Sequence, residues 1–214
     1  FTTGKAPENE TADHEDGIAR VGGQREPDYV HSYHRAAAEL IKSSDARPGA
    51  LDEFAMPIFY LQRHTVELAL KRLLRSVVEI QELGRSVRLI DEHPTWDESE
   101  AVKPLGEHSL PDLFDALRNG LNDQSIQLPE VFESTVEAIN TIEEENPMLA
   151  RYRTKKSGER HLPDELEVDL SAIQRNLDGI LEHFPDTLDP EQELDEEALE
   201  TQLYYAWKRH VHSS

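Results

Sequence analysis

Cysteine is absent from this chain of 214 residues, which excludes disulfide bonds, thiolate metal ligands and cysteine nucleophiles. Because a chain without cysteine suits a reducing compartment, we expect a cytoplasmic protein. Long apolar runs are missing too. No stretch approaches the roughly 18 residues of a membrane-spanning helix, and no charged segment precedes an apolar signal core. The sequence therefore predicts a protein without a membrane segment.

Basic residues are scarce relative to acidic ones. Lysine and arginine number 22 against 44 aspartates and glutamates, which gives a formal net charge of −22. Such a charge opposes attraction of the whole molecule to nucleic acid or anionic lipid. Binding of a polyanion would therefore need a local basic patch.

Several catalytic signatures are also missing. The chain has no Gly-x-Ser-x-Gly elbow, no Walker phosphate loop and no dinucleotide-binding glycine fingerprint. His31 and His34 stand three residues apart in a helical segment, but they could bind a metal only with a third ligand, which the sequence does not identify. We therefore predict no metal and no cofactor, and the hydrolase, P-loop and Rossmann classes lack support.

Apolar residues at helical spacing dominate what is present. Residues 1–26 lack this periodicity and are predicted to form a flexible arm, whereas residues 27–184 carry successive amphipathic segments. Residues 185–214 combine an acidic run with one more amphipathic helix. Alternation with a period of two is nowhere sustained. The sequence predicts an all-α fold, a bundle of four to five core helices with antiparallel neighbours and an added C-terminal helix.

Capping and turn residues set the predicted helix boundaries. Helices are expected over residues 29–44, 56–83, 110–117, 129–145 and 163–183. Pro57 is placed in the first turn of the second helix, where its missing N–H is tolerated, and Gly84 at that helix's end. Ser109 is predicted to cap the third helix and Asn119-Gly120 to stop it. Residues 84–106 are expected to form a long connection.

The second helix carries polar side chains among its apolar residues. Arg63, Glu67 and Lys71 follow one another at a spacing of four, and His64 lies three residues before Glu67, so all four share one helix face. If another element covers that face, the four groups form a paired polar site inside the fold. If it is uncovered, Arg63, Glu67, Lys71 and Arg75 form an ordinary solvated face with ion pairs. Both interpretations are compatible with the sequence.

Basic side chains gather in one loop. Residues 151–161 hold five of the 22 lysines and arginines. Arg151 and Arg153 could contact phosphate, and Tyr152 could stack on a base. The alternative is a solvated loop without a ligand.

Three segments, in this order, resemble motifs of the HEPN superfamily, small all-α domains named for their occurrence in higher eukaryotes and prokaryotes and for nucleotide binding. Glu67-Leu68-Ala69-Leu70-Lys71-Arg72-Leu73-Leu74 is similar to the family's Glu-x-x-Leu-Lys-x-Leu-Leu helix. His108-Ser109-Leu110-Pro111-Asp112-Leu113 is similar to its His-Asp-Leu-x-x-Leu segment, and Arg151-Tyr152 to the Arg-Tyr before its last helix. The resemblance covers about residues 29–184.

The resemblance implies a four- or five-helix up-and-down bundle, often a homodimer. Many members are metal-independent ribonucleases of toxin–antitoxin, abortive-infection and CRISPR systems, and others bind only nucleotides or proteins. The ribonucleases carry Arg-x4–6-His near the start of a late helix. Here that spacing occurs at Arg25–His31 and Arg88–His93, about the two matches expected by chance, and neither lies before the late helix.

Candidate site residues follow from the matched positions. We expect His64 or His108 to act as general acid or base towards a ribose 2′-OH, with Arg63, Arg151 or Arg153 stabilising charge on the phosphorus oxygens. The predicted ligand-binding residues are Glu67, Lys71, Arg151, Tyr152 and Arg153.

Two functions from different classes follow. The first is a prokaryotic defence or toxin–antitoxin protein that binds RNA or a nucleotide through a basic groove, with ribonuclease activity and an antitoxin partner as further expectations. The second is a non-catalytic interaction module whose acidic surface docks a protein partner. A small-molecule sensor is a third alternative.

Overall fold

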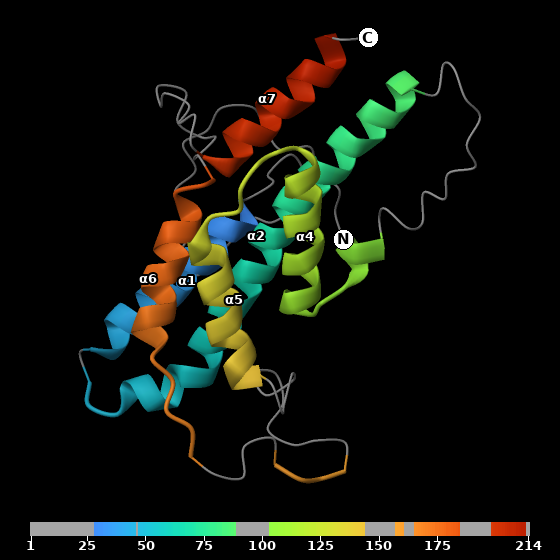
Figure 1. Ribbon diagram of the computed structural model, residues 1–214. Coiled ribbons are helices and arrows are strands. Elements are labelled where there is room, and N and C mark those ends of the chain that lie inside the picture. Colours follow the sequence, from blue (N-terminus) through green and yellow to red (C-terminus); the bar gives the residue numbers. More distant parts are fainter. Residues whose placement is uncertain are drawn as a thin grey trace, which may run out of the picture.

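The computed structural model describes residues 28–45, 47–88, 103–143, 157–160, 165–184 and 198–212. These residues form six α-helices and one short 3-10 helix, and no strand (Figure 1). The all-α prediction is therefore confirmed at this level. The predicted arm over residues 1–26 lies outside the described residues, as does most of the basic loop. Among the described helices, none combines the length and the apolar character needed to cross a membrane.

The first helix agrees with its prediction, and the second is longer than predicted. α1 spans Tyr29–Ser44, and the side chain of its N-cap residue Asp28 accepts a hydrogen bond from the backbone N–H of His31. α2 spans Ala50–Arg88, so Pro57 lies inside this helix, not in its first turn, and Gly84 does not end it.

Pro57 removes one backbone hydrogen bond from α2, and its ring crowds the preceding turn. The helix nevertheless extends to the N-terminal side of it, where three apolar residues pack against the core. These residues are Phe54, Ala55 and Met56. Tertiary packing therefore overrides the local helix-start signal of Pro57.

Two other predicted boundaries are wrong. α4 spans Leu110–Asp123 with Ser109 as its N-cap, as predicted, but it continues through Gly120. Gly120 packs so closely on α2 that a Cβ atom there would lie 2.4 Å from Cγ1 of Val77, so this glycine permits helix contact and is not a stop signal. α6 spans Leu170–Leu181 and begins later than predicted, because Asp169 caps it by accepting from the N–H of Ala172 at 2.8 Å.

The structure describes three further helical elements. The short 3-10 helix η1 spans Lys103–Gly106, α5 spans Glu130–Glu143 and α7 spans Leu199–His212. The α5 and C-terminal helices were expected at these places.

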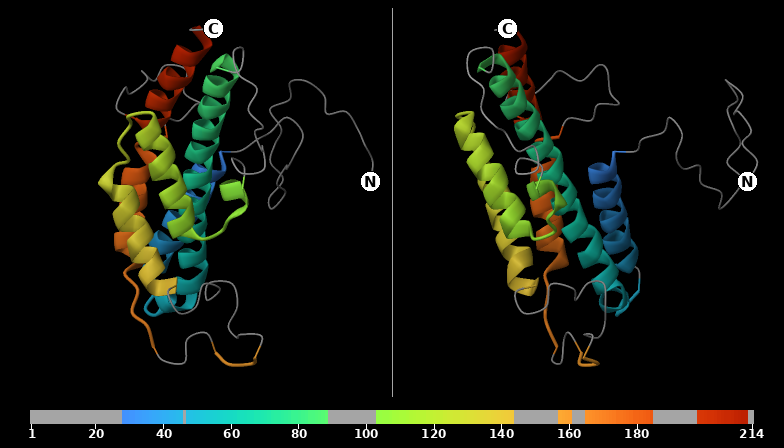
Figure 2. Two further views of the ribbon diagram at one scale, coloured as in Figure 1. Left: turned by 45° about the vertical axis from the view of Figure 1, so that its right-hand side comes forward. Right: turned by 90° about the vertical axis from the view of Figure 1, so that its right-hand side faces the viewer.

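α2 is the central helix, and the others pack around it (Figures 1 and 2). α1 and α2 are antiparallel, as are α4 and α5. α4 instead runs parallel to α2, since His108 contacts Glu67 before α4 begins, and Gly120 meets Val77 near its other end. The expectation of antiparallel neighbours is therefore wrong for this pair. The long connection between α2 and η1 makes the parallel arrangement possible.

The core lies along α2 and takes buried apolar side chains from every α-helix. Its largest fully buried members include Phe59, Leu70, Leu73, Leu113, Leu117, Phe132, Ile139 and Phe184. Arg72 connects α2 to the N-cap of α1 and to α7. Its guanidinium donates to Asp28 at 2.6 Å and to Glu200 on α7 at 2.9 Å, and it lies 5.3 Å from the ring centre of Phe184. The C-terminal helix is therefore attached directly to the central helix.

Candidate functional site

The polar stripe of α2 is buried. Residues Arg63, Glu67 and Lys71 are 7%, 3% and 8% exposed. The interpretation of a solvated face is therefore wrong for these three residues, and that of a paired polar site inside the fold is confirmed. Arg75, the fourth residue of the predicted solvated face, is exposed. Glu143 of α5, which is also buried, helps to cover this polar face of α2.

Each of the three guanidinium nitrogens of Arg63 donates to a group of the protein. Nε donates to both carboxylate oxygens of Glu143 at 2.8 and 3.0 Å, and Nη1 donates to Glu67 at 2.7 Å. Nη2 donates to the backbone carbonyl of His108 at 2.7 Å. Arg63 thus links α2, α5 and the segment before α4, and its donors point inward and not towards solvent.

Glu67 is the centre of the site. It accepts hydrogen bonds from Arg63, from Lys71 Nζ at 3.0 Å and from Nδ1 of His108 at 2.7 Å. Burial alone raises the pKa of the Glu67 carboxyl, but the hydrogen bonds from His108, Lys71 and Arg63 outweigh burial and lower the pKa to about 2. Glu67 is therefore a carboxylate at any neutral pH.

These residues form a charge-balanced unit, which we call the Glu67 network: Arg63, Glu67, Lys71, Glu143 and His108. Two cations face two buried carboxylates, so the network needs no external counter-ion when His108 is neutral. The sequence identified four of its members. It gave no signal for Glu143, because that residue stands in a run of three glutamates and only the packing of α5 on α2 selects it.

His108 is the exposed member of the Glu67 network. Its side chain is 69% exposed, although Nδ1 is held on the buried Glu67 carboxylate. Because an ionised carboxylate can only accept, Nδ1 carries the hydrogen of this bond. In the neutral imidazole Nε2 is then the free acceptor, and Nε2 forms no hydrogen bond with a described residue.

His64 lies on the other side of the same carboxylate. Its Nδ1 is 4.0 Å from one oxygen of Glu67, and its side chain is 21% exposed. Tyr33 meets its ring edge-on at 4.6 Å between centres, and Tyr60 stacks on it at 5.8 Å. His64 is therefore enclosed by two aromatic rings, whereas His108 faces solvent.

The other candidate residues do not join this site or cannot be placed. Arg151, Tyr152 and Arg153 lie outside the described residues. His31 and His34 bind different carboxylates, Asp28 and Asp178, at 3.0 and 2.7 Å. Within the described part of the chain no group of side chains has the composition of a metal site.

Comparison of the chain with family models, curated proteins and solved structures returned no match.

Proposed function

We propose that this protein is a HEPN-like helical domain that binds RNA or a nucleotide at His108 and uses the Glu67–His108 pair as a metal-independent general base. A prokaryotic defence or toxin–antitoxin setting is part of the same proposal. The observation that carries it is a solvent-facing imidazole whose Nδ1 is fixed, at 2.7 Å, by a buried carboxylate.

This arrangement suits proton abstraction for two reasons. Glu67 fixes the tautomer, leaving Nε2 as the basic atom on the exposed side of the ring. Arg63 holds the backbone of His108 through its carbonyl and the imidazole through Glu67, so the ring's position is set from both ends. In RNA, Nε2 would accept the ribose 2′-OH proton while the 2′-oxygen bonds to phosphorus. The bond from phosphorus to the 5′-oxygen would break and the 5′-oxygen would take a proton from water, giving a 2′,3′-cyclic phosphate and a 5′-hydroxyl end.

The described residues also constrain how the phosphate could be bound. The donors of Arg63 and Lys71 are directed at Glu67, Glu143 and the His108 carbonyl, so we assign these two residues to positioning and not to phosphate contact. We propose instead that Arg151 and Arg153 contact the phosphate.

The test uses end-labelled RNA and labelled nucleotides with purified protein in EDTA, comparing wild type with His108→Gln. We expect the variant to lose about 10²- to 10⁴-fold in cleavage rate, the usual contribution of a general base, and cleavage to leave cyclic phosphate ends. His34→Gln is the matched control, because His34 also pairs with a carboxylate at 2.7 Å but lies outside the Glu67 network. Unchanged cleavage and binding by His108→Gln would overturn the proposal.

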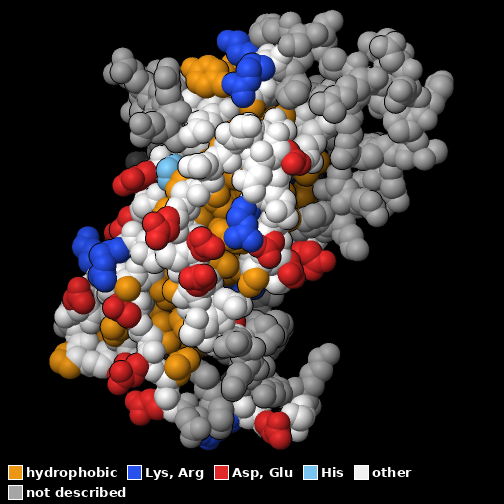
Figure 3. All heavy atoms as spheres, in the orientation of Figure 1, with side chains coloured by type: hydrophobic (Ala, Val, Ile, Leu, Met, Phe, Trp, Pro, Cys, Tyr) orange, Lys and Arg blue, Asp and Glu red, His pale blue; other side chains and the backbone are white. Residues whose placement is uncertain are grey.

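A second candidate function is a non-catalytic interaction module. The observation that favours it is the charge balance of the Glu67 network, which makes Arg63 and Lys71 structural. The face shown in Figure 3 carries many carboxylates, drawn in red, which would attract a basic partner. The same experiment distinguishes the two functions, because an interaction module requires no RNA or nucleotide binding at His108.

A further inference from the structure

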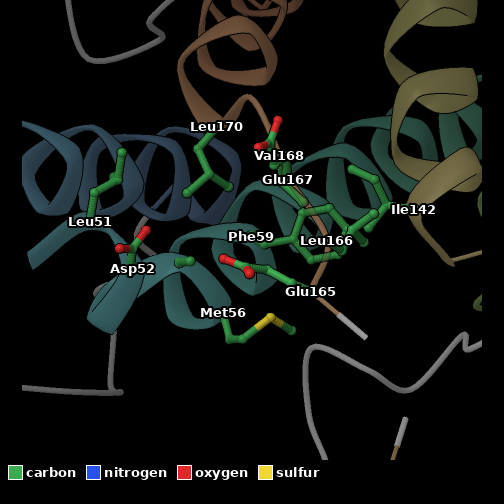
Figure 4. A pocket seen from close by; sticks show the side chains of 11 residues that line it. Leu51, Asp52, Met56, Phe59, Ile142, Glu165, Leu166, Glu167, Val168 and Leu170 are labelled. Atoms are coloured by element: carbon green, nitrogen blue, oxygen red, sulfur yellow. The ribbon is translucent and has the colours of Figure 1, made fainter. Parts of the chain in front are cut away.

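A groove lies at the end of the bundle formed by the start of α2, the end of α5 and the segment before α6 (Figure 4). Its volume is about 310 Å³, enough for one or two apolar side chains. Phe59 and Leu170 form its buried floor. Leu51 and Leu166 line its walls and are 40% and 46% exposed, so the groove leaves large apolar side chains in water.

The charged side chains that the structure describes in the lining of the groove are all acidic. Asp52, Glu165 and Glu167 line it, and no lysine, arginine or histidine among the described residues does. Figure 4 shows these carboxyl groups among the apolar side chains. All three residues are exposed, and none forms an ion pair with another described residue, whereas neighbouring Glu53 pairs with Arg47.

The apolar lining and the three acidic side chains together determine which kind of ligand the groove can bind. An apolar group would be removed from water by the floor and walls. A cation beside it would meet three carboxylates that form no ion pair with another described residue. The net charge of −22 would attract the same cation from a distance.

The backbone favours a peptide over a small cation. Residues 165–167 are not helical and their backbone forms no hydrogen bond with another described residue. An extended peptide could pair with these groups while one of its side chains enters the groove.

We propose that this groove binds a basic segment of a partner protein, with an apolar side chain on Phe59 and Leu166 and with lysine or arginine on Asp52, Glu165 and Glu167. The proposal is independent of the Glu67–His108 pair, because the groove and the Glu67 network share no residue. A negative result for one proposal therefore does not contradict the other.

The test is fluorescence anisotropy with the fluorescein-labelled peptide Lys-Arg-Leu-Phe-Arg-Lys and a matched peptide in which Ser-Ser replaces Leu-Phe. We expect the first to bind and the second to bind at least several-fold more weakly. The double variant Glu165→Lys/Glu167→Lys should weaken binding of the first peptide by roughly tenfold or more, since two attractive charges become repulsive. Leu166→Ser should weaken the Leu-Phe peptide and leave the Ser-Ser peptide unchanged.

The matched control is Glu137→Lys/Glu182→Lys, which changes the net charge equally at exposed positions outside the groove. It should retain most of the binding, and His108→Gln should retain all of it. Circular dichroism confirms that each variant keeps its helix content. No binding of the Leu-Phe peptide to wild type, unchanged binding after Glu165→Lys/Glu167→Lys, or equal losses in both double variants would overturn the proposal.

Discussion

The guanidinium of Arg63 donates hydrogen bonds to three acceptor groups from three parts of the chain. Replacing it with methionine keeps the length of the side chain but leaves Glu67 and Glu143 as buried carboxylates without this partner. We expect Arg63→Met to lower the free energy of unfolding by roughly 3–5 kcal/mol, as for other broken buried ion pairs. Urea denaturation measures this change.

Arg47→Met is the control for Arg63→Met, because Arg47 pairs with Glu53 where both side chains are more than half exposed. Its loss should be no more than about 1 kcal/mol. Similar small losses in both variants would show that the Glu67 network contributes little to stability.

The ionisation of Glu67 predicts a dependence of stability on pH. Its pKa falls from 4.5 to about 2 on folding, so the folded state favours the carboxylate. The stabilisation is complete above pH 4.5 and is lost as pH falls towards 2, by roughly 3 kcal/mol in all. Urea denaturation over this pH range measures it. Glu67→Gln should show a shallower decline, and an identical decline would contradict the prediction.

Among the helices, α4 approaches α2 closely at Gly120. Alanine at this position improves helix propensity by up to about 1 kcal/mol, but its Cβ would overlap Val77. We expect Gly120→Ala to destabilise the protein by roughly 1–3 kcal/mol, the usual effect of overpacking. Thermal or urea denaturation measures the change.

A double-mutant cycle with Val77→Ala checks the cause. In that background Gly120→Ala should be neutral or stabilising, because the Cγ1 methyl of Val77 that it overlaps is gone. Equal losses in both backgrounds would show that the contact is not responsible.

Over the whole molecule, 44 acidic side chains against 22 basic ones make the folded chain repel itself. We expect the thermal midpoint to rise when sodium chloride is raised from roughly 0.01 M to 0.15 M, because the Debye length falls to about 8 Å. Scanning calorimetry measures the shift. A midpoint that falls with salt would mean that exposed ion pairs, such as Arg118–Asp115, outweigh the repulsion.

The sequence by itself determined the helical class, the position of α1 and the shared face of Arg63, Glu67 and Lys71 on α2. These features depend on spacing along one helix, which is local and fixed by 3.6 residues per turn. The HEPN resemblance and the role of His108 stay predictions.

Only the tertiary structure decided whether that face is buried, which carboxylate of α5 reaches Arg63, and that Gly120 lies within a helix. The parallel course of α2 and α4 belongs to the same group. Each depends on contacts between residues far apart in sequence, where packing against the core outweighs local signals such as Pro57 or Asn119-Gly120. The exposed imidazole of His108 on a buried carboxylate is the clearest case, since its two partners are 41 positions apart in the chain.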